Sequence, residues 1–381
     1  MNRRAKRRYK KAQRGGNIGL KRSTYLNVKF FCNICYVFVT LEGVLHHVSN
    51  DKLEANEREI TVNETELVLI LENYKVIPDK ITSLRKAEKL LMKIKNAEEN
   101  TFYLKGEKGD SEYVERCCEY ADYLKHEGFP VASYTRNTLG CFTYLKDNMV
   151  FTLEEEIEGV EVQTLTDEHL NSIAKMLGVQ HQLSNQSNRS INQATSWSLF
   201  GGNATEDIGD YDENERAFWQ MRDTCKSDPI FQRIEELYIQ RRDHLKRIWF
   251  SLPSGPVQGD FCYYNMVFTE SASLKGCFDF NLAGDEIYIN ELVSVAIYHC
   301  WHVPYSGQKT EIERFWSFMR HYEKERTITP KERSILSDLF AIIRAFRYDR
   351  VEEGLTLQGE QRNDFLRETM NILESHLHYE K

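Results

Sequence analysis

GPVQGDFCYYNMVF, residues 255–268, and GCFDFNLAG, residues 276–284, decide the fold of this chain. Both stretches are rich in apolar and aromatic residues and contain glycine, a composition that is typical of short strands joined by tight turns. Asp260 and Asn265 lie in the first stretch, and Asp279 lies in the second. We therefore expect a strand-turn-strand insert that brings these three oxygen-bearing side chains together.

The chain before this insert has the pattern of a small β-rich half. Residues 111–128 place apolar side chains at helical spacing and end at Gly128, which predicts an amphipathic helix. An earlier helix is predicted to begin at Asn63, because Glu66 follows at the capping-box position. Short apolar runs between charged turns predict antiparallel strands at residues 81–84, 90–94, 101–106, 141–146 and 149–159.

Beyond Gly159 the apolar spacing is mostly helical, and three long helical patterns follow residue 310. The fold class is therefore α+β, with a small antiparallel sheet and one helix followed by a larger helical half that contains the insert. We expect three regions: a basic extension at residues 1–55, a nucleotide-binding lobe at 56–159 and a helical lobe at 160–381.

The first 22 residues of the chain differ in charge from all the rest. They carry ten Lys or Arg and no acidic residue, whereas the remainder has 40 basic and 58 acidic residues, a net charge near −18. Such a body repels nucleic acid and favours cationic small molecules, while the basic segment alone could contact an anionic surface. Blocks of like charge are usually solvated tails, so disorder is the expected state of residues 1–22.

Residues 30–41, FFCNICYVFVTL, form an apolar run near the N-terminus. A membrane-spanning helix needs about 20 apolar residues, so we expect no transmembrane segment here. Cys32 and Cys35 could begin a zinc site, but the nearby His46 and His47 do not complete a second ligand pair at suitable spacing. The nine cysteines form no disulfide framework, which favours reduced thiols in the cytoplasm.

The oxygen-bearing side chains of the insert predict phosphoryl-transfer chemistry. Mg²⁺ prefers hard oxygen ligands and keeps several waters, so Asn265 and Asp279 are the expected metal ligands. In kinase-type enzymes the Asp of an Asp-x-x-x-x-Asn loop accepts the proton of the acceptor hydroxyl, which assigns Asp260 as the catalytic base. The lysine that holds the nucleotide phosphates is expected on the third strand, where TFYLKG places Lys105.

The segment QGDFCYYNMVF followed by GCFDFNLAGDEIYINELVSVAIY resembles the catalytic region of the aminoglycoside phosphotransferase and choline kinase superfamily, which includes spore-coat kinase-like members. The resemblance covers residues 60–375 and implies a bilobal protein-kinase-like fold that uses ATP and Mg²⁺. It implies the same roles for the four residues just named and a structural role for Glu291. It also implies that LEEEIEG is the hinge between the lobes, where adenine would meet the backbone of Glu155, Glu156 and Ile157.

Three features depart from the family pattern. Gln258 stands where the family has His, and the first hairpin, residues 81–94, contains no glycine to cover the phosphates. The helix acid that pairs with Lys105 could be Glu115 or Glu119, and Glu115 lies nearer the apolar stripe. Two functions therefore stay open: a kinase acting on a hydroxyl of a small amine-bearing molecule, and a pseudokinase-like binding or coat protein without turnover.

Several other residues have a structural and a functional interpretation. His181 follows a helical stripe and is expected to be structural, and Tyr263 and Tyr264 are expected to pack rather than to contact a substrate. Aromatic residues at helical spacing are usually core, but three could line a pocket for a cation: Trp301, Tyr305 and Trp316. Acidic residues of the helical half favour an amine-bearing ligand through their charge: Glu352, Glu353, Glu360 and Asp364.

Overall fold

The computed structural model describes residues 62–86, 89–200 and 212–377. Residues Lys52–Lys381 form one compact unit, which contains every described residue. The basic segment, the apolar run with its two cysteines and the turn of the first hairpin lie outside the described residues. The predictions made for them therefore stay predictions.

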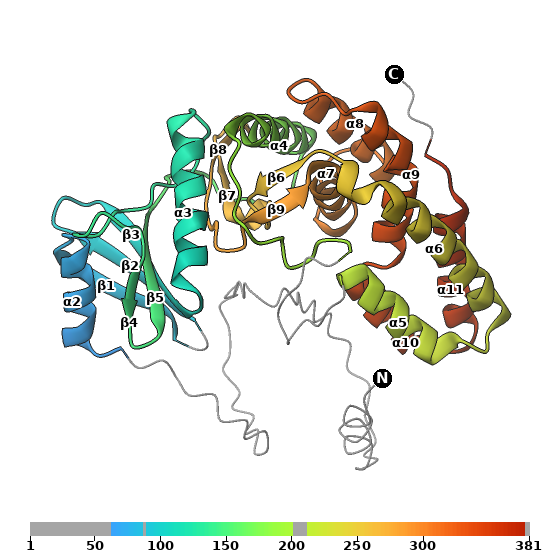
Figure 1. The fold of residues 1–381 in the computed structure, drawn as a ribbon, viewed down its shortest axis with the longest axis horizontal. Coiled ribbons are helices and arrows are strands. Elements are labelled where there is room, and N and C mark those ends of the chain that lie inside the picture. Colours follow the sequence, from blue (N-terminus) through green and yellow to red (C-terminus); the bar gives the residue numbers. More distant parts are fainter. Residues whose placement is uncertain (1–61, 87–88, 201–211, 378–381) are drawn as a thin grey trace, which may run out of the picture. The chain divides into compact units, whose positions relative to one another are not determined.

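The small lobe is built on a five-stranded antiparallel sheet with the strand order β1-β2-β3-β5-β4 (Figure 1). Its strands overlap the five predicted runs, which are short apolar segments between charged turns. Their bounds are β1 (Pro78–Lys86), β2 (Leu90–Asn96), β3 (Thr101–Lys108), β4 (Tyr144–Lys146) and β5 (Met149–Glu155).

Two helices, α2 (Glu64–Asn73) and α3 (Ser111–His126), cover this sheet. The Asn63 side chain accepts the backbone N–H of Glu66 and the Glu66 side chain accepts that of Asn63, so α2 begins with the predicted capping box. Because successive strand residues face opposite sides, the sheet has two apolar faces. The face that bears Met92, Ile94 and Leu104 packs against α2, and the opposite face packs Val150 against α3. Both helices were predicted from the residue pattern, although the predicted fold class counts only one helix in this lobe.

The large lobe is mainly helical, as predicted beyond Gly159. Its helices are α4 (Asp167–Ser187), α5 (Glu213–Cys225), α6 (Pro229–Ile248), α7 (Tyr288–Ile297), α8 (Glu311–Glu323), α9 (Pro330–Ala345), α10 (Tyr348–Thr356) and α11 (Gly359–Glu374). A single buried cluster joins them, with members such as Ile173, Leu292, Phe315, Leu339 and Leu366. Across the described part of the chain, no helix combines the length and apolar character needed to span a membrane.

The insert consists of two small antiparallel sheets placed between α6 and α7. Strand β6 (Ser254–Val257) pairs with β9 (Gly284–Ile287), and β7 (Met266–Phe268) pairs with β8 (Leu274–Cys277). Asp260 and Asn265 follow β6, and Asp279 follows β8. The two connections lie side by side, since the Phe278 N–H donates to the Asn265 carbonyl at 3.1 Å.

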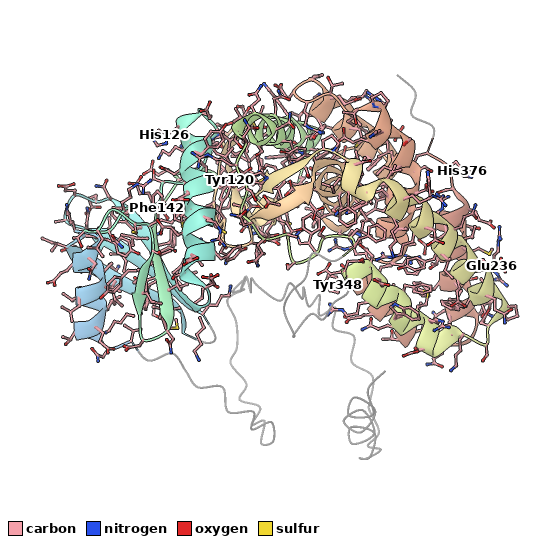
Figure 2. The ribbon with its side chains drawn as sticks, viewed as in Figure 1. Tyr120, His126, Phe142, Glu236, Tyr348 and His376 are labelled. Atoms are coloured by element: carbon pink, nitrogen blue, oxygen red, sulfur yellow. The ribbon has the colours of Figure 1, made fainter. Side chains whose placement is uncertain are left out.

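Helix α3 of the small lobe contacts the insert directly. The hydroxyl of Tyr120, labelled on this helix in Figure 2, donates to the Pro256 carbonyl at 2.9 Å and lies 2.6 Å from Ser184 Oγ of α4. The Tyr113 hydroxyl donates to the Ala283 carbonyl at 2.9 Å. These bonds fix the sheet-bearing lobe against the segment that carries the candidate catalytic residues.

Candidate active site

Asp260 and Asn265 are held together at the end of β6. The Asn265 side-chain NH₂ donates to Asp260 Oδ2 at 2.9 Å and to the Asp260 carbonyl at 3.1 Å. The Tyr264 hydroxyl donates to Asp260 Oδ1 at 2.8 Å. Both oxygens of the Asp260 carboxylate therefore accept a hydrogen bond, and the Asn265 amide is oriented with its nitrogen toward Asp260.

Asp279 has a backbone φ of 63°, in the left-handed region that few residues other than glycine adopt. Three bonds hold it there. Its N–H donates to Glu154 Oε1 at 3.1 Å, its carbonyl accepts the Gln258 amide at 2.7 Å, and its carboxylate accepts Lys105 Nζ at 3.1 Å. Residues in such sparsely populated conformations persist where the surroundings over-determine them, and they cluster at functional sites.

Gln258, the residue that departs from the family pattern, is fully buried and uses both ends of its amide. Its oxygen accepts the Asp260 N–H at 2.8 Å, and its nitrogen donates to the carbonyls of Phe278 and Asp279. One side chain thus ties the Asp260 loop to the Asp279 turn. A glutamine thus makes hydrogen bonds to both segments at the position where the family pattern has His.

Lys105 lies between two carboxylates. Its Nζ is 2.5 Å from Glu154 of β5 and 3.1 Å from Asp279. The strand register explains the first contact, because Lys105 stands opposite Thr152, and Glu154 is two residues further along the same face. Glu154 was not predicted from the sequence.

The predicted pairing of Lys105 with Glu115 is wrong. The Glu115 carboxylate instead accepts the backbone N–H groups of Phe142 and Thr143 and the Thr143 hydroxyl, at 2.7 to 2.9 Å. The second candidate, Glu119, is exposed. Helix α3 turns Val114 and Cys118 toward the sheet, and this rotation directs the Glu115 side chain to the segment before β4.

Burial and neighbouring charges shift the pKa values of two of these groups. Burial disfavours the charged ammonium of Lys105, but the carboxylates of Asp279 and Glu154 outweigh it and raise its pKa above the usual range. Burial also raises the pKa of Asp260, against hydrogen bonds from Cys262 and Tyr264 that lower it. Lys105 is therefore charged at neutral pH, and its charge is held inside the site.

Two buried side chains, Glu291 and His181, hold the loop at Gly259 in place. The Gly259 N–H donates to Glu291 Oε1 at 3.2 Å, and Glu291 Oε2 lies 2.5 Å from His181 Nε2. Burial raises the pKa of Glu291 to about 8 and lowers that of His181 below its usual value, so the pair is neutral overall near pH 7. Glu291 and His181 thus occupy structural positions. Gly259 has a φ of 81°, and a Cβ at this residue would lie 2.0 Å from the Leu282 carbonyl oxygen.

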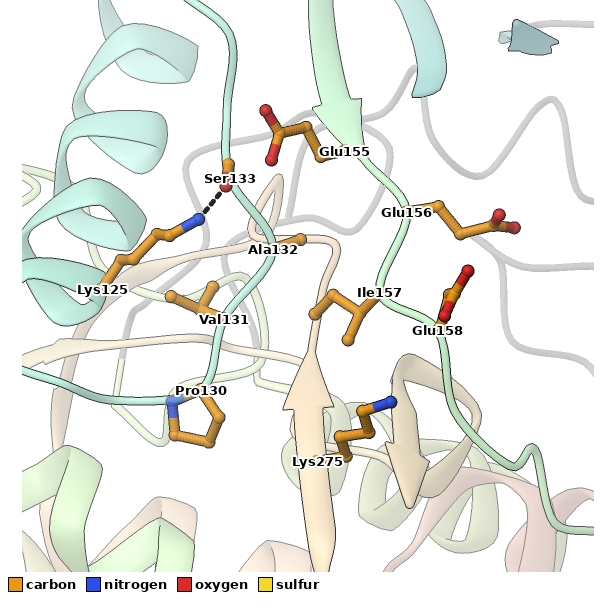
Figure 3. A pocket seen from close by; sticks show the side chains of 10 residues that line it. All are labelled: Lys125, Pro130, Val131, Ala132, Ser133, Glu155, Glu156, Ile157, Glu158 and Lys275. Carbon is orange, nitrogen blue, oxygen red and sulfur yellow. Dashed lines mark hydrogen bonds between the residues drawn. The ribbon is translucent and has the colours of Figure 1, made fainter. Parts of the chain in front are cut away.

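The segment predicted to be the hinge begins at the last residue of β5. The Glu155 N–H donates to the Ser133 carbonyl and the Glu156 N–H to the Thr101 carbonyl, so neither amide is a free donor for a base. Figure 3 shows Glu155, Glu156 and Ile157 lining a cavity of about 370 Å³ together with residues 130–133. The residues around this cavity do not include Lys105, and the predicted contact with adenine stays a prediction.

The three aromatic side chains considered for a cation pocket pack against the core of the large lobe. The guanidinium of Arg344 lies 5.3 Å from the Trp301 ring and that of Arg314 lies 4.2 Å from the Tyr305 ring. Trp316 makes an edge contact with Phe315. At Trp301 and Tyr305 the position of a ligand cation is thus taken by an arginine of the protein itself.

The oxygen ligands available fit a hard cation that also binds phosphate. No group of three or more His, Cys, Asp or Glu side chains that could hold a metal occurs in the described ranges. Mg²⁺ usually takes one or two carboxylates and completes its shell with water and substrate phosphates. Asp279 supplies a carboxylate, and the Asn265 amide donates its nitrogen to Asp260, which leaves its oxygen as the candidate ligand atom. The donor set is therefore compatible with Mg²⁺.

No family model and no curated protein sequence matches this chain. Solved structures do resemble it. The amicoumacin kinase hAmiN, in complex with AMP-PNP and Ca²⁺, is 16% identical over 82% of this chain and 94% of its own, with a TM-score of 0.56. An aminoglycoside phosphotransferase from Alicyclobacillus acidocaldarius is 12% identical over 85% and 99%, with a TM-score of 0.54. A microcompartment-associated aminopropanol kinase is 12% identical over 82% and 94%, with a TM-score of 0.55. The chain has the bilobal, kinase-like α+β fold of the aminoglycoside phosphotransferases and related small-molecule kinases, as its motifs predicted.

Proposed function

We propose that this protein is an ATP- and Mg²⁺-dependent phosphotransferase that acts on a hydroxyl group of a small, amine-bearing molecule. One observation carries the proposal: Lys105 of the small lobe bonds the carboxylate of Asp279, and Gln258 ties the Asp279 turn to Asp260. The residues proposed to bind phosphate, to bind the metal and to act as the base are thereby connected by direct contacts. Phosphoryl transfer needs this kind of positioning more than covalent chemistry.

Each residue has a defined part in this proposal. Asp260 orients the acceptor hydroxyl and receives its proton, Lys105 binds the nucleotide phosphates, and Asn265 and Asp279 hold the metal. When bound, Mg²⁺ neutralises charge on the phosphates. The ammonium of Lys105 has three donors, and Glu154 and Asp279 take two of them, so the third can reach a phosphate.

The preference for an amine-bearing acceptor rests on charge and on the neighbours. The body of the chain has a net charge near −18 without its first 22 residues, which favours cations. The acidic residues noted in the sequence lie exposed on α10 and α11. One structural neighbour is an aminopropanol kinase, and aminopropanol carries both an amine and a hydroxyl group.

Two conservative substitutions test the proposed division of roles. Asp260→Asn is expected to bind MgATP almost normally and to lose turnover by roughly 10²-fold or more, as for a positioned general base. Asp279→Asn is expected to weaken MgATP binding itself, because a charged metal ligand becomes neutral while Asn still tolerates the left-handed backbone. Calorimetric titration of ATP at fixed Mg²⁺ measures binding, and a screen of aminoglycosides, choline, ethanolamine and amino sugars supplies the acceptor.

The exposed Glu119→Gln on α3 is the matched control, with binding and turnover unchanged. Equal loss of MgATP affinity in both aspartate variants would contradict the separate roles. Unchanged turnover in Asp260→Asn would remove it as the base.

A pseudokinase-like binding or coat protein is the second candidate, and the Lys105–Glu154 contact favours it. This buried carboxylate already satisfies part of the charge that a phosphate would take. The first hairpin also has no glycine to close over a nucleotide. The two candidates predict different results: a thermal shift with MgATP followed by measurable phosphoryl transfer supports the kinase, whereas a shift without any turnover supports the pseudokinase.

The remaining proposals concern the organisation of the chain and its surroundings. We retain the lobe boundary at residues 159–160, because β5 ends just before it and α4 begins just after. The cysteines at the described positions are all free, which agrees with the proposed reducing environment of the cytoplasm. Residues 1–22 are proposed to contact an anionic surface through their ten basic side chains.

A further inference from the structure

Three side chains form a polar cluster where the small sheet meets the segment predicted to be the hinge. Glu156 Oε1 lies 2.6 Å from Lys93 Nζ of β2 and accepts the Tyr103 hydroxyl of β3 at 2.7 Å. Lys93 Nζ also lies 5.5 Å from the centre of the Tyr103 ring. One carboxylate oxygen thus joins the chain after β5 to two neighbouring strands.

The strand register places this cluster on the face of the sheet that carries Lys105. Tyr103 precedes Lys105 by two residues, so both side chains project from the same face of β3, and Lys93 stands directly opposite Tyr103 on β2. The Glu156 N–H donates to the Thr101 carbonyl at 2.9 Å, two residues before Tyr103. Tyr103 therefore lies between the backbone predicted to meet a base and the lysine proposed to bind phosphates.

The base end of this path is closed by contacts within the protein. A nucleotide whose base met the hinge backbone and whose phosphates met Lys105 would extend across Tyr103, since two strand residues span about 6.6 Å. The N–H groups of Glu155 and Glu156 are already bonded to carbonyls. Burial alone would raise the pKa of Glu156, but hydrogen bonds from Lys93 and Tyr103 outweigh it and lower that pKa, so the carboxylate in the cluster is ionised at neutral pH.

We propose that Lys93, Tyr103 and Glu156 form a latch that determines nucleotide affinity: the base binds only after the contacts of Glu156 with Lys93 and Tyr103 have opened. The inference rests on the proposed function and concerns the nucleotide end of the same site. A ligand that binds one of two conformations has its apparent affinity reduced by the fraction of protein in that conformation. Weakening the latch is therefore expected to strengthen nucleotide binding.

Two variants weaken the latch in different ways. Tyr103→Phe removes one contact of Glu156 without a change of charge, and Lys93→Met removes the other. The Lys93 and Glu156 side chains are 41% and 29% exposed. Each variant is expected to bind MgATP about two- to tenfold more tightly, as measured by calorimetric titration at fixed Mg²⁺. Lys93→Met is the sharper test, because loss of a cation that only attracted phosphate would weaken binding of an anionic nucleotide.

Lys95→Met is the matched control for Lys93→Met. Lys95 lies two residues further along β2, on the same face, and its ion pair is with Glu99 in the turn to β3. The same charge is therefore lost from the same strand without opening the latch, and the MgATP affinity of Lys95→Met is expected not to rise.

The outcomes separate this inference from the proposed function. If no acceptor is phosphorylated but both latch variants bind MgATP more tightly and Lys95→Met does not, the proposed activity fails and the latch stands. If an acceptor is phosphorylated while both latch variants bind MgATP no more tightly than the unchanged protein, the latch fails and the activity stands. An equal gain of affinity in Lys95→Met and Lys93→Met overturns the latch, as does the absence of MgATP binding in the unchanged protein and in both latch variants.

Discussion

The contact between Lys105 and Glu154 makes a prediction that does not depend on the protein's activity. An acidic residue of α3 was expected to pair with Lys105. If Glu154 forms this ion pair instead, Lys105 must be energetically coupled to Glu154 and not to Glu115. A double-mutant cycle with Lys105→Met and Glu154→Gln isolates the first coupling, and a parallel cycle with Glu115→Gln isolates the second.

The expected coupling can be worked from the geometry. Unit charges 4 Å apart interact by about 4 kcal/mol at an effective dielectric constant of about 20, whereas exposed ion pairs contribute about 0.2–1 kcal/mol. The Lys105 and Glu154 atoms are 2.5 Å apart, and their side chains are 21% and 3% exposed. Because water still reaches the lysine and Asp279 remains as a second partner, we expect a coupling of about 2–3 kcal/mol.

Urea unfolding of the four proteins of each cycle gives the coupling free energies. The Lys105–Glu115 cycle is expected to be additive within about 0.5 kcal/mol, although Glu115→Gln alone destabilises the protein through its lost bonds to residues 142–143. A larger coupling to Glu115 than to Glu154 would refute the assignment. So would a Lys105–Glu154 coupling no greater than that of a surface pair.

Two further predictions concern the insert. Burial raises the pKa of Glu286 from its usual 4.5 to about 7. The contribution of Glu286 to the unfolding free energy is therefore fully present below pH 4.5 and is lost as pH rises through 7. The unfolding free energy of the unchanged protein relative to Glu286→Gln should therefore fall by about 3 kcal/mol across this window, and pH-independent differences in denaturant melts would contradict it. Gly259→Ala must adopt a φ of 81° and meet the Leu282 carbonyl, so it should destabilise the protein by roughly 3 kcal/mol or more. Thermal unfolding compared with Gly109→Ala, where a Cβ meets no atom within 4 Å, tests this, and equal melting temperatures would argue against it.

The sequence was sufficient for those parts of the molecule that depend on local spacing. Strand and helix positions in the small lobe follow from side-chain periods of two and 3.6 residues, and α2 begins at the predicted cap. Asp260 and Asn265 are five residues apart in one loop, so their contact needs only a tight turn. Asp279 could be placed beside them because it follows the next hairpin.

Glu154 and Tyr264 show what local spacing cannot determine. Three glutamates occur in succession at residues 154–156, and only the register of β5 against β3 selects which one faces Lys105. The rotation of α3 about its axis likewise depends on how Cys118 packs against the sheet. The apolar stripe of the helix determines this rotation only to within about one residue. In the sequence, Tyr264 has the pattern of an ordinary strand residue. Its side chain reaches Asp260 only because the backbone reverses in the 3₁₀ turn at Tyr263–Asn265.

The support beneath Gly259 extends further than the catalytic loop. His181 lies 2.8 Å from the Tyr322 hydroxyl, which also accepts a hydrogen bond from Arg326, and Arg326 in turn bonds Glu332 at the start of α9. All of these side chains are at most 5% exposed. At 0.1 M salt, interactions between exposed charges are largely screened beyond about 10 Å, whereas buried pairs are screened much less. The position of the loop should therefore change little with ionic strength. The affinity for a charged nucleotide or acceptor should fall as salt is added. A salt titration can thus distinguish weakened ligand attraction from a displaced loop.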